Sequence, residues 1–308
     1  MIAAFAMRGR LQAVVAATLF VLLALLFPPA VIASTAIAAL VTLRLGVRPG
    51  LEVILLSTLV LGVLGMGLFG TPSLAGVSLV VWLPVWVLAV VLRYSQSLSL
   101  TVQLALLMGL VPLVLEFFFF SGPEGWGELL GPLKESLEKS QVLPPEQIAE
   151  VMAWLALWLT AFMAGGLFLQ TCLGLFLARS WQAKLYNPGG FREEFHALRV
   201  SKPLTYSATL LLLALFLAGG DQWPLVRVAA VVLIVIFFLQ GLAVMHSLLA
   251  ASKAGEGWMF GVYALLLFAL PYMTMTLAAT GFVDAWWNLR KAGQKGRPND
   301  AGNAGDDD

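Results

Sequence analysis

The sequence contains few charged residues. Only 11% of its 308 residues are Asp, Glu, Lys or Arg, whereas a soluble domain carries about 25%. A soluble surface needs polar cover, which a chain that is 60% hydrophobic cannot supply. The composition therefore excludes a soluble globular protein. It predicts an all-α, polytopic transmembrane helical bundle, because each helical crossing needs roughly 20 mostly apolar residues.

The residues and motifs of most soluble enzymes are also missing. The single cysteine, Cys172, excludes an intramolecular disulfide and a CxxC site. The two histidines, His196 and His246, lie far apart and make no zinc-ligand pattern. No phosphate loop, GxGxxG, HExxH or GxSxG motif occurs. We therefore expect no metal, no cofactor and no enzymatic activity. The formal net charge of +1 gives no indication of a nucleic-acid partner.

Apolar runs, separated by charges and by Pro/Gly clusters, predict eight to ten membrane spans. The runs are Leu11–Phe27, Ala30–Leu43, Leu51–Phe69, Val77–Leu92, Ser99–Phe120, Val151–Ala178, Leu204–Leu217, Leu225–Ala251 and Trp258–Val283. A cleaved signal peptide is the alternative for the first run, but the spans that follow favour an uncleaved helix. Pro271 divides the last run into two half-length helices or leaves it partly in the interface.

These runs predict four regions. Residues 1–180 form a six-helix membrane core with an outer insertion at 121–150. Residues 181–203 form a cytoplasmic interfacial loop, residues 204–290 the C-terminal membrane helices, and residues 291–308 a tail that is disordered by composition.

Lys and Arg in the short loops predict the orientation. Arg8 and Arg10 place the N-terminus on the cytoplasmic side of a bacterial inner membrane. Arg44, Arg93 and the basic residues of 181–203 then also lie inside, and the Glu-rich segment 121–150 lies outside. Nine spans would place Arg290, Lys291, Lys295 and Arg297 outside, against the rule.

Two polar segments leave alternatives open. The segment Ser121–Glu150 is either an amphipathic helix on the outer face or a solvated connector. The stretch "YNPGGFREEFHALRVSKP", Tyr186–Pro203, suits a short helix on the inner interface. It is either a membrane-surface connector or a docking surface that uses Phe191, Arg192, Phe195 and Arg199.

Polar residues inside spans are candidate ligand or cavity-lining residues, because burying them in hydrocarbon is unfavourable. They are Glu116, Gln103, Gln170, Gln240 and His246. Each has a structural alternative: an interfacial position for Glu116, helix-to-helix bonding for the three amides, and a packed or interfacial histidine. We expect Asp284 to pair with Arg290 or Lys291.

Small residues four apart predict close helix packing or contact with a partner protein. Ala13 and Ala17 have this spacing in the first span, and Gly174 and Ala178 have it in the sixth. In a chain so rich in alanine the pattern is common, so it does not distinguish the two uses.

Three stretches carry a resemblance to a known family: "TLRLGVRPG", "LQGLAVMH" (Leu239–His246) and "GFVDAWWNLRK" (Gly281–Lys291). With them the chain resembles the YybS-like family of bacterial integral membrane proteins, which have no established function. Its first six spans are similar in architecture to the S-components of energy-coupling-factor transporters. That similarity implies contact of Ala13 and Ala17 with a coupling subunit.

Two functional hypotheses follow, and both have the lipid bilayer as a partner. The first is a solute-binding or transport protein that acts as a non-ATPase subunit beside a separate coupling subunit and ATPase. The alternative is a membrane scaffold or assembly factor for cell-envelope machinery, with Tyr186–Pro203 as its docking face. A polar cavity between spans would favour the first, and a filled core the second. An intramembrane enzyme would need a nucleophile–base pair, which the sequence does not suggest.

Overall fold

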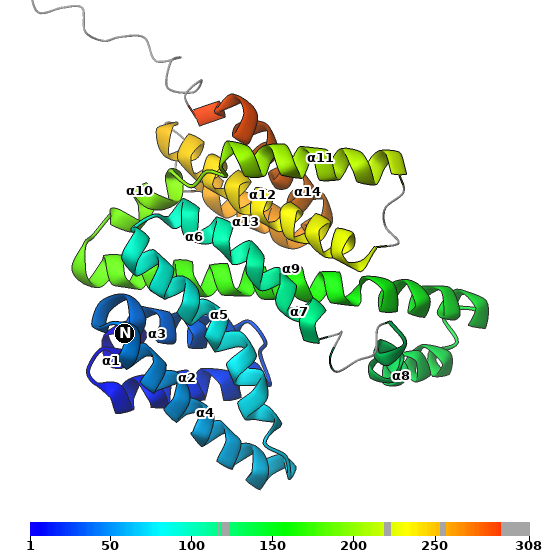
Figure 1. Cartoon of the computed structure of the whole chain (residues 1–308), viewed down its shortest axis with the longest axis horizontal. Helices are drawn as coiled ribbons and strands as arrows, with labels where there is room; N and C mark the ends of the chain where they lie inside the picture. The colour runs from blue at the N-terminus through cyan, green and yellow to red at the C-terminus, as the bar shows by residue number, and fades with distance from the viewer. Residues whose placement is uncertain (116–117, 119–122, 219–222, 253–256, 291–308) are drawn as a thin grey trace, which may run out of the picture. The chain divides into compact units, whose positions relative to one another are not determined.

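The computed structural model describes residues 1–115, 118, 123–218, 223–252 and 257–290, and within them all regular structure is helical (Figure 1). The chain packs as two compact units. Unit 1 comprises Met1–Glu194 and Leu211–Leu233, and unit 2 comprises Phe195–Leu210 and Ile234–Asp308. The all-α fold predicted from composition is confirmed.

Unit 1 contains the N-terminal helices. They are α1 (Ile2–Ala6), α2 (Arg10–Ala24), α3 (Ala30–Leu45), α4 (Val47–Phe69), α5 (Ser73–Ser95), α6 (Leu98–Leu104), the 3-10 helix η1 (Ala105–Gly109), α7 (Leu110–Leu115), α8 (Pro123–Ser140) and α9 (Pro145–Tyr186). The unit boundary at Glu194 falls within the short helix α10 (Gly190–His196).

Unit 2 contains the C-terminal helices. They are the first half of α11 (Lys202–Ala218), the second part of α12 (Pro224–Ala251), and all of α13 (Gly257–Phe268) and α14 (Leu270–Trp287). The remaining parts of α11 and α12 belong to unit 1.

Five helical segments are long and apolar enough to cross a membrane. They are α4, α5, the α6–η1–α7 segment, α9 and α12, and shorter apolar helices include α2, α3 and α13. These segments support the multi-pass membrane protein predicted from the sequence. The 42 residues of α9 extend over about 63 Å, which exceeds the roughly 45 Å of a whole bilayer.

The predicted span Ser99–Phe120 is not one continuous α-helix. The 3-10 helix η1 separates α6 from α7, and Pro112 follows within α7. Proline lacks the amide that would bond the carbonyl four residues earlier, here that of Met108 inside η1. The proline therefore gives a local reason for the break.

The predicted span Trp258–Val283 is also divided. Helix α13 ends at Phe268 and α14 begins at Leu270, with Pro271 in the first turn of α14. Of the two alternatives for this run, the structure has two separate helices. At 12 residues, α13 is about 18 Å long, too short to cross a hydrocarbon core of about 30 Å by itself.

The centre of unit 1 is α3, which contacts α2, α4, α5 and α9. Its residues Ser34–Leu43 are all buried. Ser34 links two neighbours, because its hydroxyl donates to the Ala17 carbonyl at 2.7 Å and accepts from Trp82 Nε1 at 3.0 Å. These two bonds join α2, α3 and α5, and they give a partner to the buried Ser34 hydroxyl and to the Trp82 indole N–H.

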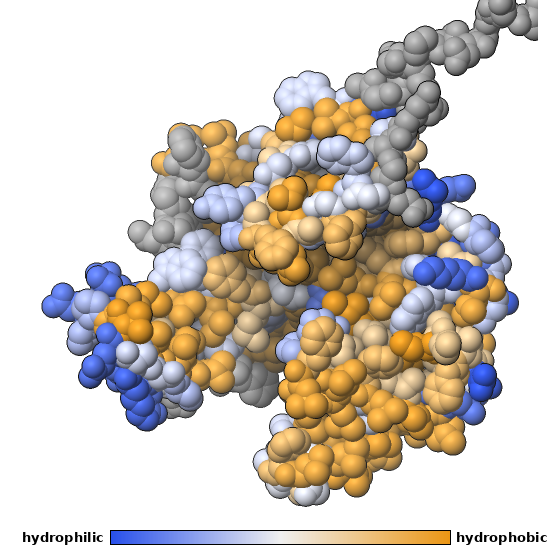
Figure 2. Space-filling view, turned by 180° about the vertical axis from the view of Figure 1, so that it is seen from behind, coloured by the Kyte–Doolittle hydropathy of each residue, from blue (hydrophilic) through white to orange (hydrophobic). Residues whose placement is uncertain are grey.

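The surface of unit 1 is apolar between two polar ends. On the face in Figure 2, hydrophobic side chains cover a broad area, and hydrophilic side chains gather at α8 and at the opposite, basic end. At the basic end Arg10 pairs with Glu52 at 2.9 Å. An apolar band between polar ends is the surface expected of helices in a bilayer.

In unit 2, α12 and α14 approach each other backbone to backbone. A Cβ added to Gly241 would lie 1.9 Å from the Leu277 carbonyl oxygen, and one added to Gly281 would lie 2.0 Å from that of Phe237. A side chain at either position would therefore clash with backbone atoms, which cannot rotate away. Close crossings at small residues are typical of membrane helices.

We expect Gly281→Ala to destabilise unit 2 by about 3 kcal/mol, the upper end of the usual cost of overpacking, because the clash is with main chain. Thermal unfolding in detergent, followed by tryptophan fluorescence, measures the loss. Gly261→Ala in α13 is the matched control, because nothing lies within 4 Å of its added Cβ. Equal melting temperatures for the two variants would contradict the close crossing.

Candidate functional site

A buried polar cluster lies in unit 2 around Asp284. One carboxylate oxygen, Oδ2, accepts hydrogen bonds from Gln240 Nε2 at 2.8 Å and from Arg290 Nη2 at 2.7 Å. Asp284 and Gln240 are completely buried, and the Arg290 side chain is 11% exposed. Gln240 also accepts from the Val200 amide at 2.8 Å. The expected pairing of Asp284 with Arg290 is confirmed.

The same cluster fixes the chain before α11 against the end of α14. Arg290 donates to the carbonyls of His196 and Leu198. In the other direction, Lys202 donates to the Ala285 carbonyl at 2.7 Å and Arg199 to the Asp284 carbonyl at 3.1 Å. Lys202 thereby satisfies a carbonyl in the last turn of α14, where carbonyls lack partners from the next turn. Arg199 adds a second donor to the Asp284 carbonyl, which also accepts from the Asn288 amide at 2.9 Å.

These bonds bear on the orientation of the C-terminus. If the chain made nine straight spans, Arg290 and the basic 181–203 segment would lie on opposite sides of the bilayer. The structure instead places Arg290 beside His196 and Leu198 of that segment. The last apolar run is broken near Pro271, so it is not one straight helix.

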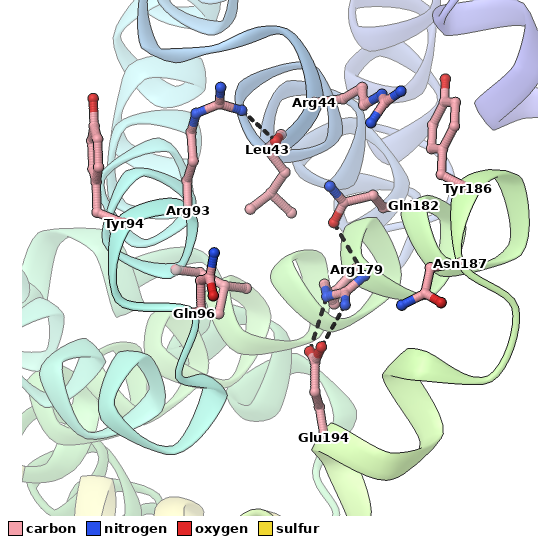
Figure 3. A pocket seen from close by; sticks show the side chains of 11 residues that line it. Leu43, Arg44, Arg93, Tyr94, Gln96, Arg179, Gln182, Tyr186, Asn187 and Glu194 are labelled. Carbon is pink, nitrogen blue, oxygen red and sulfur yellow. Dashed lines mark hydrogen bonds and ion pairs between the residues drawn. The ribbon is translucent and has the colours of Figure 1, made fainter.

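A second polar region is an open pocket at the basic end of unit 1, with a volume of about 640 Å³ (Figure 3). It is formed by the C-terminal ends of α3, α5 and α9 and by the start of the 181–203 segment. The lining residues are Leu43, Arg44, Leu92, Arg93, Tyr94, Gln96, Arg179, Gln182, Tyr186, Asn187 and Glu194. A pocket of this size accommodates a small molecule or a headgroup.

The arginines of the pocket are held in different ways. Arg179 forms a two-point ion pair with Glu194 and donates to Gln182 at 3.2 Å. Arg93 donates to the Leu43 carbonyl at 2.6 Å. The guanidinium of Arg44 lies over the Tyr186 ring, 4.1 Å from its centroid. In Figure 3, Arg44 and Arg93 lie on either side of Leu43, and Arg179 and Glu194 lie across from them.

Local sequence explains how the pocket is assembled. Arg44 and Arg93 are in the last turns of α3 and α5, where a cation interacts favourably with the helix dipole. After α9 the residues "NPGG" turn the chain, with Gly189 at a φ of +91° that favours glycine. This turn returns α10 toward α9, so that Glu194 meets Arg179.

The candidate amides in spans are engaged within the protein. Gln103 Nε2 donates to the Ser99 carbonyl of its own helix at 2.8 Å. Gln170 Nε2 donates to Thr35 Oγ1 at 3.1 Å, between α9 and α3. The bonds of Gln170 and Gln240 join different helices and agree with the structural alternative of helix-to-helix bonding, whereas this bond of Gln103 stays within its own helix. Glu116 lies outside the described residues.

His246 lies in unit 2 beside the other histidine. Its Nε2 is 2.8 Å from the Tyr263 hydroxyl, and its ring centroid is 6.4 Å from that of His196. The ring of Phe195 meets it edge-on at 5.4 Å. Two residues that are 50 positions apart in sequence are thus neighbours, which their spacing did not predict. Among the described residues there is no group of three or more His, Cys, Asp or Glu able to hold a metal ion.

The small residues expected at helix contacts lie inside unit 1. Ala13 and Ala17 are each 1% exposed, and Gly174 and Ala178 are buried. A Cβ on Gly174 would lie 2.3 Å from Thr35 Oγ1. The positions therefore serve packing between the protein's own helices, and in this conformation they offer no surface to a partner protein.

The expected docking residues divide between the two units. In unit 1, Phe191 lies 6.2 Å from the Phe176 ring and Arg192 is exposed. In unit 2, Phe195 packs on His246 and Arg199 bonds to the end of α14. The helix expected within Ser121–Glu150 is present as α8, and it packs on α9 through a bond from Trp126 Nε1 to Thr160 at 3.0 Å.

Sequence reasoning did not identify the pocket residues as a site. Arg44 and Arg93 served only as indicators of orientation. The same pattern contained a usable signal, because basic residues in successive loops on one side of a membrane must share one end of a bundle. The aromatic and amide residues that line the pocket carry no such signal.

We expect Asp284→Asn to destabilise the protein by roughly 3–5 kcal/mol, since it leaves the buried Arg290 guanidinium without its counter-ion. Thermal unfolding in detergent measures the effect. Glu135→Gln is the control, because Glu135 and Lys139 form an exposed ion pair in α8 worth less than about 1 kcal/mol. A stability of Asp284→Asn equal to that of the control would show that the cluster contributes little.

Comparisons with protein-family models, with curated proteins and with solved structures give no match for this chain. The resemblance to YybS-like proteins and to transporter S-components therefore stays a prediction from the sequence. The function is argued below from the geometry of the polar pocket and of the packed helices.

Proposed function

We propose that the protein is a non-enzymatic, multi-pass membrane protein that binds a small polar molecule in the pocket at the basic end of unit 1. The observation that carries this proposal is the pocket itself, about 640 Å³ in volume and lined by three arginines, two tyrosines and several amides. Such polar groups converging in a concave site are the usual signature of ligand binding.

The packing of the helices favours a ligand site at this end of unit 1 over one between the helices. The in-span amides Gln103, Gln170 and Gln240 bond within the protein, and the centre of α3 is filled. We therefore place the approach of the ligand at the basic end of unit 1, where the pocket opens.

The proposed setting is a bacterial inner membrane with the N-terminus and the pocket on the cytoplasmic side. Arg44, Arg93 and Arg179 line one pocket, and Arg10 pairs with Glu52 near the start of α4. Positive residues gathered at one end of a bundle favour that end as the cytoplasmic one. Within this setting the protein acts as a non-ATPase subunit in solute binding or transport.

Native mass spectrometry of protein extracted gently from its own membranes tests the proposal. We expect a bound small molecule on the unaltered chain, and at least a tenfold lower occupancy in Asn187→Trp, which fills the pocket. Lys184→Trp is the matched control, because Lys184 is exposed on the same stretch but does not line the pocket. The proposed function would be refuted if no small molecule were bound, or if Asn187→Trp and Lys184→Trp carried it at equal occupancy.

A second candidate, a membrane scaffold, is favoured by the filled core. The small residues Ala13, Ala17 and Gly174 are all used in packing within unit 1. This leaves no exposed AxxxA surface for a transporter coupling subunit in this conformation. The scaffold would instead use exposed residues near Arg192.

Affinity purification in mild detergent separates the two candidates. For a transport subunit we expect ATPases to co-purify, and for a scaffold, envelope-assembly proteins that depend on Arg192. We expect the Arg192→Glu variant to retain any ATPase partner. Loss of ATPases from that variant, or their absence from the unaltered chain, would count against the transport role.

A further inference from the structure

The positive charge of the basic-end pocket is not balanced by its own lining. Three arginines line it, and Glu194 is the acidic residue among the described lining residues. Three positive charges less one negative leave a formal charge of +2. Because Arg179 and Glu194 form a two-point ion pair, the surplus resides on Arg44 and Arg93.

Helix ends do not account for all of this charge. The C-termini of α3, α5 and α9 each carry a partial charge of about −0.5, so together they offset about one and a half of the two surplus charges. The carbonyl that Arg93 binds, Leu43 O, belongs to the last turn of α3. About half a unit of positive charge is then still uncompensated in an open pocket.

Hydrogen-bond donors are also in surplus. A guanidinium has five N–H donors. Among the residues that the structure describes, Arg93 has one hydrogen-bond acceptor, Leu43 O, and Arg44 has a ring contact with Tyr186 but no acceptor. Both side chains are exposed at the pocket, so their remaining donors are available to a ligand.

A phosphate group fits these donors better than a carboxylate. A single guanidinium fork occupies both oxygens of a carboxylate, whereas a phosphate has further oxygens for a second guanidinium. Arg44 and Arg93 come from two different helices, α3 and α5, and flank Leu43 (Figure 3). Tyr94 and Tyr186, which also line the pocket, are residues favoured at headgroup depth.

We infer that the pocket binds an anionic phosphate group through Arg44 and Arg93. This inference rests on the proposed function and names the chemical class of its ligand. The phosphate belongs to a phospholipid headgroup or to a small water-soluble phosphate ester, which present the same group to the two arginines.

The full chain in phosphatidylcholine nanodiscs that contain a small fraction of phosphatidylglycerol tests the inference. Native mass spectrometry measures how much phosphatidylglycerol stays bound. We expect its enrichment to fall roughly tenfold or more in Arg44→Gln, the usual loss when one charge-assisted bond to an anion is removed. Arg48→Gln is the matched control, because Arg48 is exposed nearby but does not line the pocket.

Glycerol phosphate added in water distinguishes the two sources of the group. Enrichment of phosphatidylglycerol that glycerol phosphate does not displace assigns the site to a lipid headgroup. Binding of glycerol phosphate itself, with the same dependence on Arg44, assigns it to a soluble ester. Binding of succinate as tight as that of glycerol phosphate would overturn the preference for phosphate.

A second variant separates a loss of phosphate binding from a loss of folding. Gln182→Glu keeps the acceptor that bonds Arg179 and lowers the formal charge of the pocket from +2 to +1. We expect it to weaken phosphate binding several-fold without a change in melting temperature. Phosphate binding that is unchanged in both Arg44→Gln and Gln182→Glu would overturn the inference.

Failure of the phosphate assignment can be told apart from failure of the proposed binding function. A pocket-bound molecule without phosphorus, lost in Asn187→Trp, would overturn the phosphate assignment and leave the binding function standing. No bound molecule in any preparation, and no phosphate binding in nanodiscs, would refute both.

Discussion

The packing of neighbours around α3 is the interaction on which unit 1 depends. Helices α2, α4, α5 and α9 all contact this one short helix, whose residues from Ser34 to Leu43 are buried. Lipid tails are as apolar as leucine side chains, so burial of apolar area gives little preference for one helix over another in a membrane. Close approach at small residues such as Ala17 and Gly174, and hydrogen bonds such as that from Ser34, supply the preference instead.

Polar groups in the protein serve two distinct purposes. In unit 2, Asp284, Gln240 and Arg290 form a buried cluster that fixes the chain before α11 to the end of α14. Their hydrogen-bond partners lie within the unit, and two buried atoms of the cluster, Asp284 Oδ1 and Arg290 Nε, have no hydrogen-bond partner among the described residues. In unit 1, the pocket arginines have more charge and more donors than their neighbours use. This difference is why we assign structure to the first set and ligand binding to the second.

Because two of the apolar runs form broken helices, counting runs as spans does not predict which polar segments lie at the same end of the protein. The 3-10 segment before Pro112 and the interruption before Pro271 both replace what the apolar pattern shows as single runs. The second break has the larger consequence, because it allows Arg290 to lie beside His196 and Leu198.

The sequence by itself determined the membrane class, the all-helical fold and the approximate limits of most helices, because these follow from the length of apolar runs and from proline and glycine positions. It also predicted that Asp284 pairs with a cation close by in the sequence, Arg290 or Lys291, and the structure shows Arg290 as the partner. Tertiary structure alone decided that Gln240 joins that pair, that His196 and His246 are neighbours, and that Arg44, Arg93 and Arg179 line one pocket. The physical reason is that these contacts join residues distant in sequence, and no local pattern specifies which faces of two helices will meet.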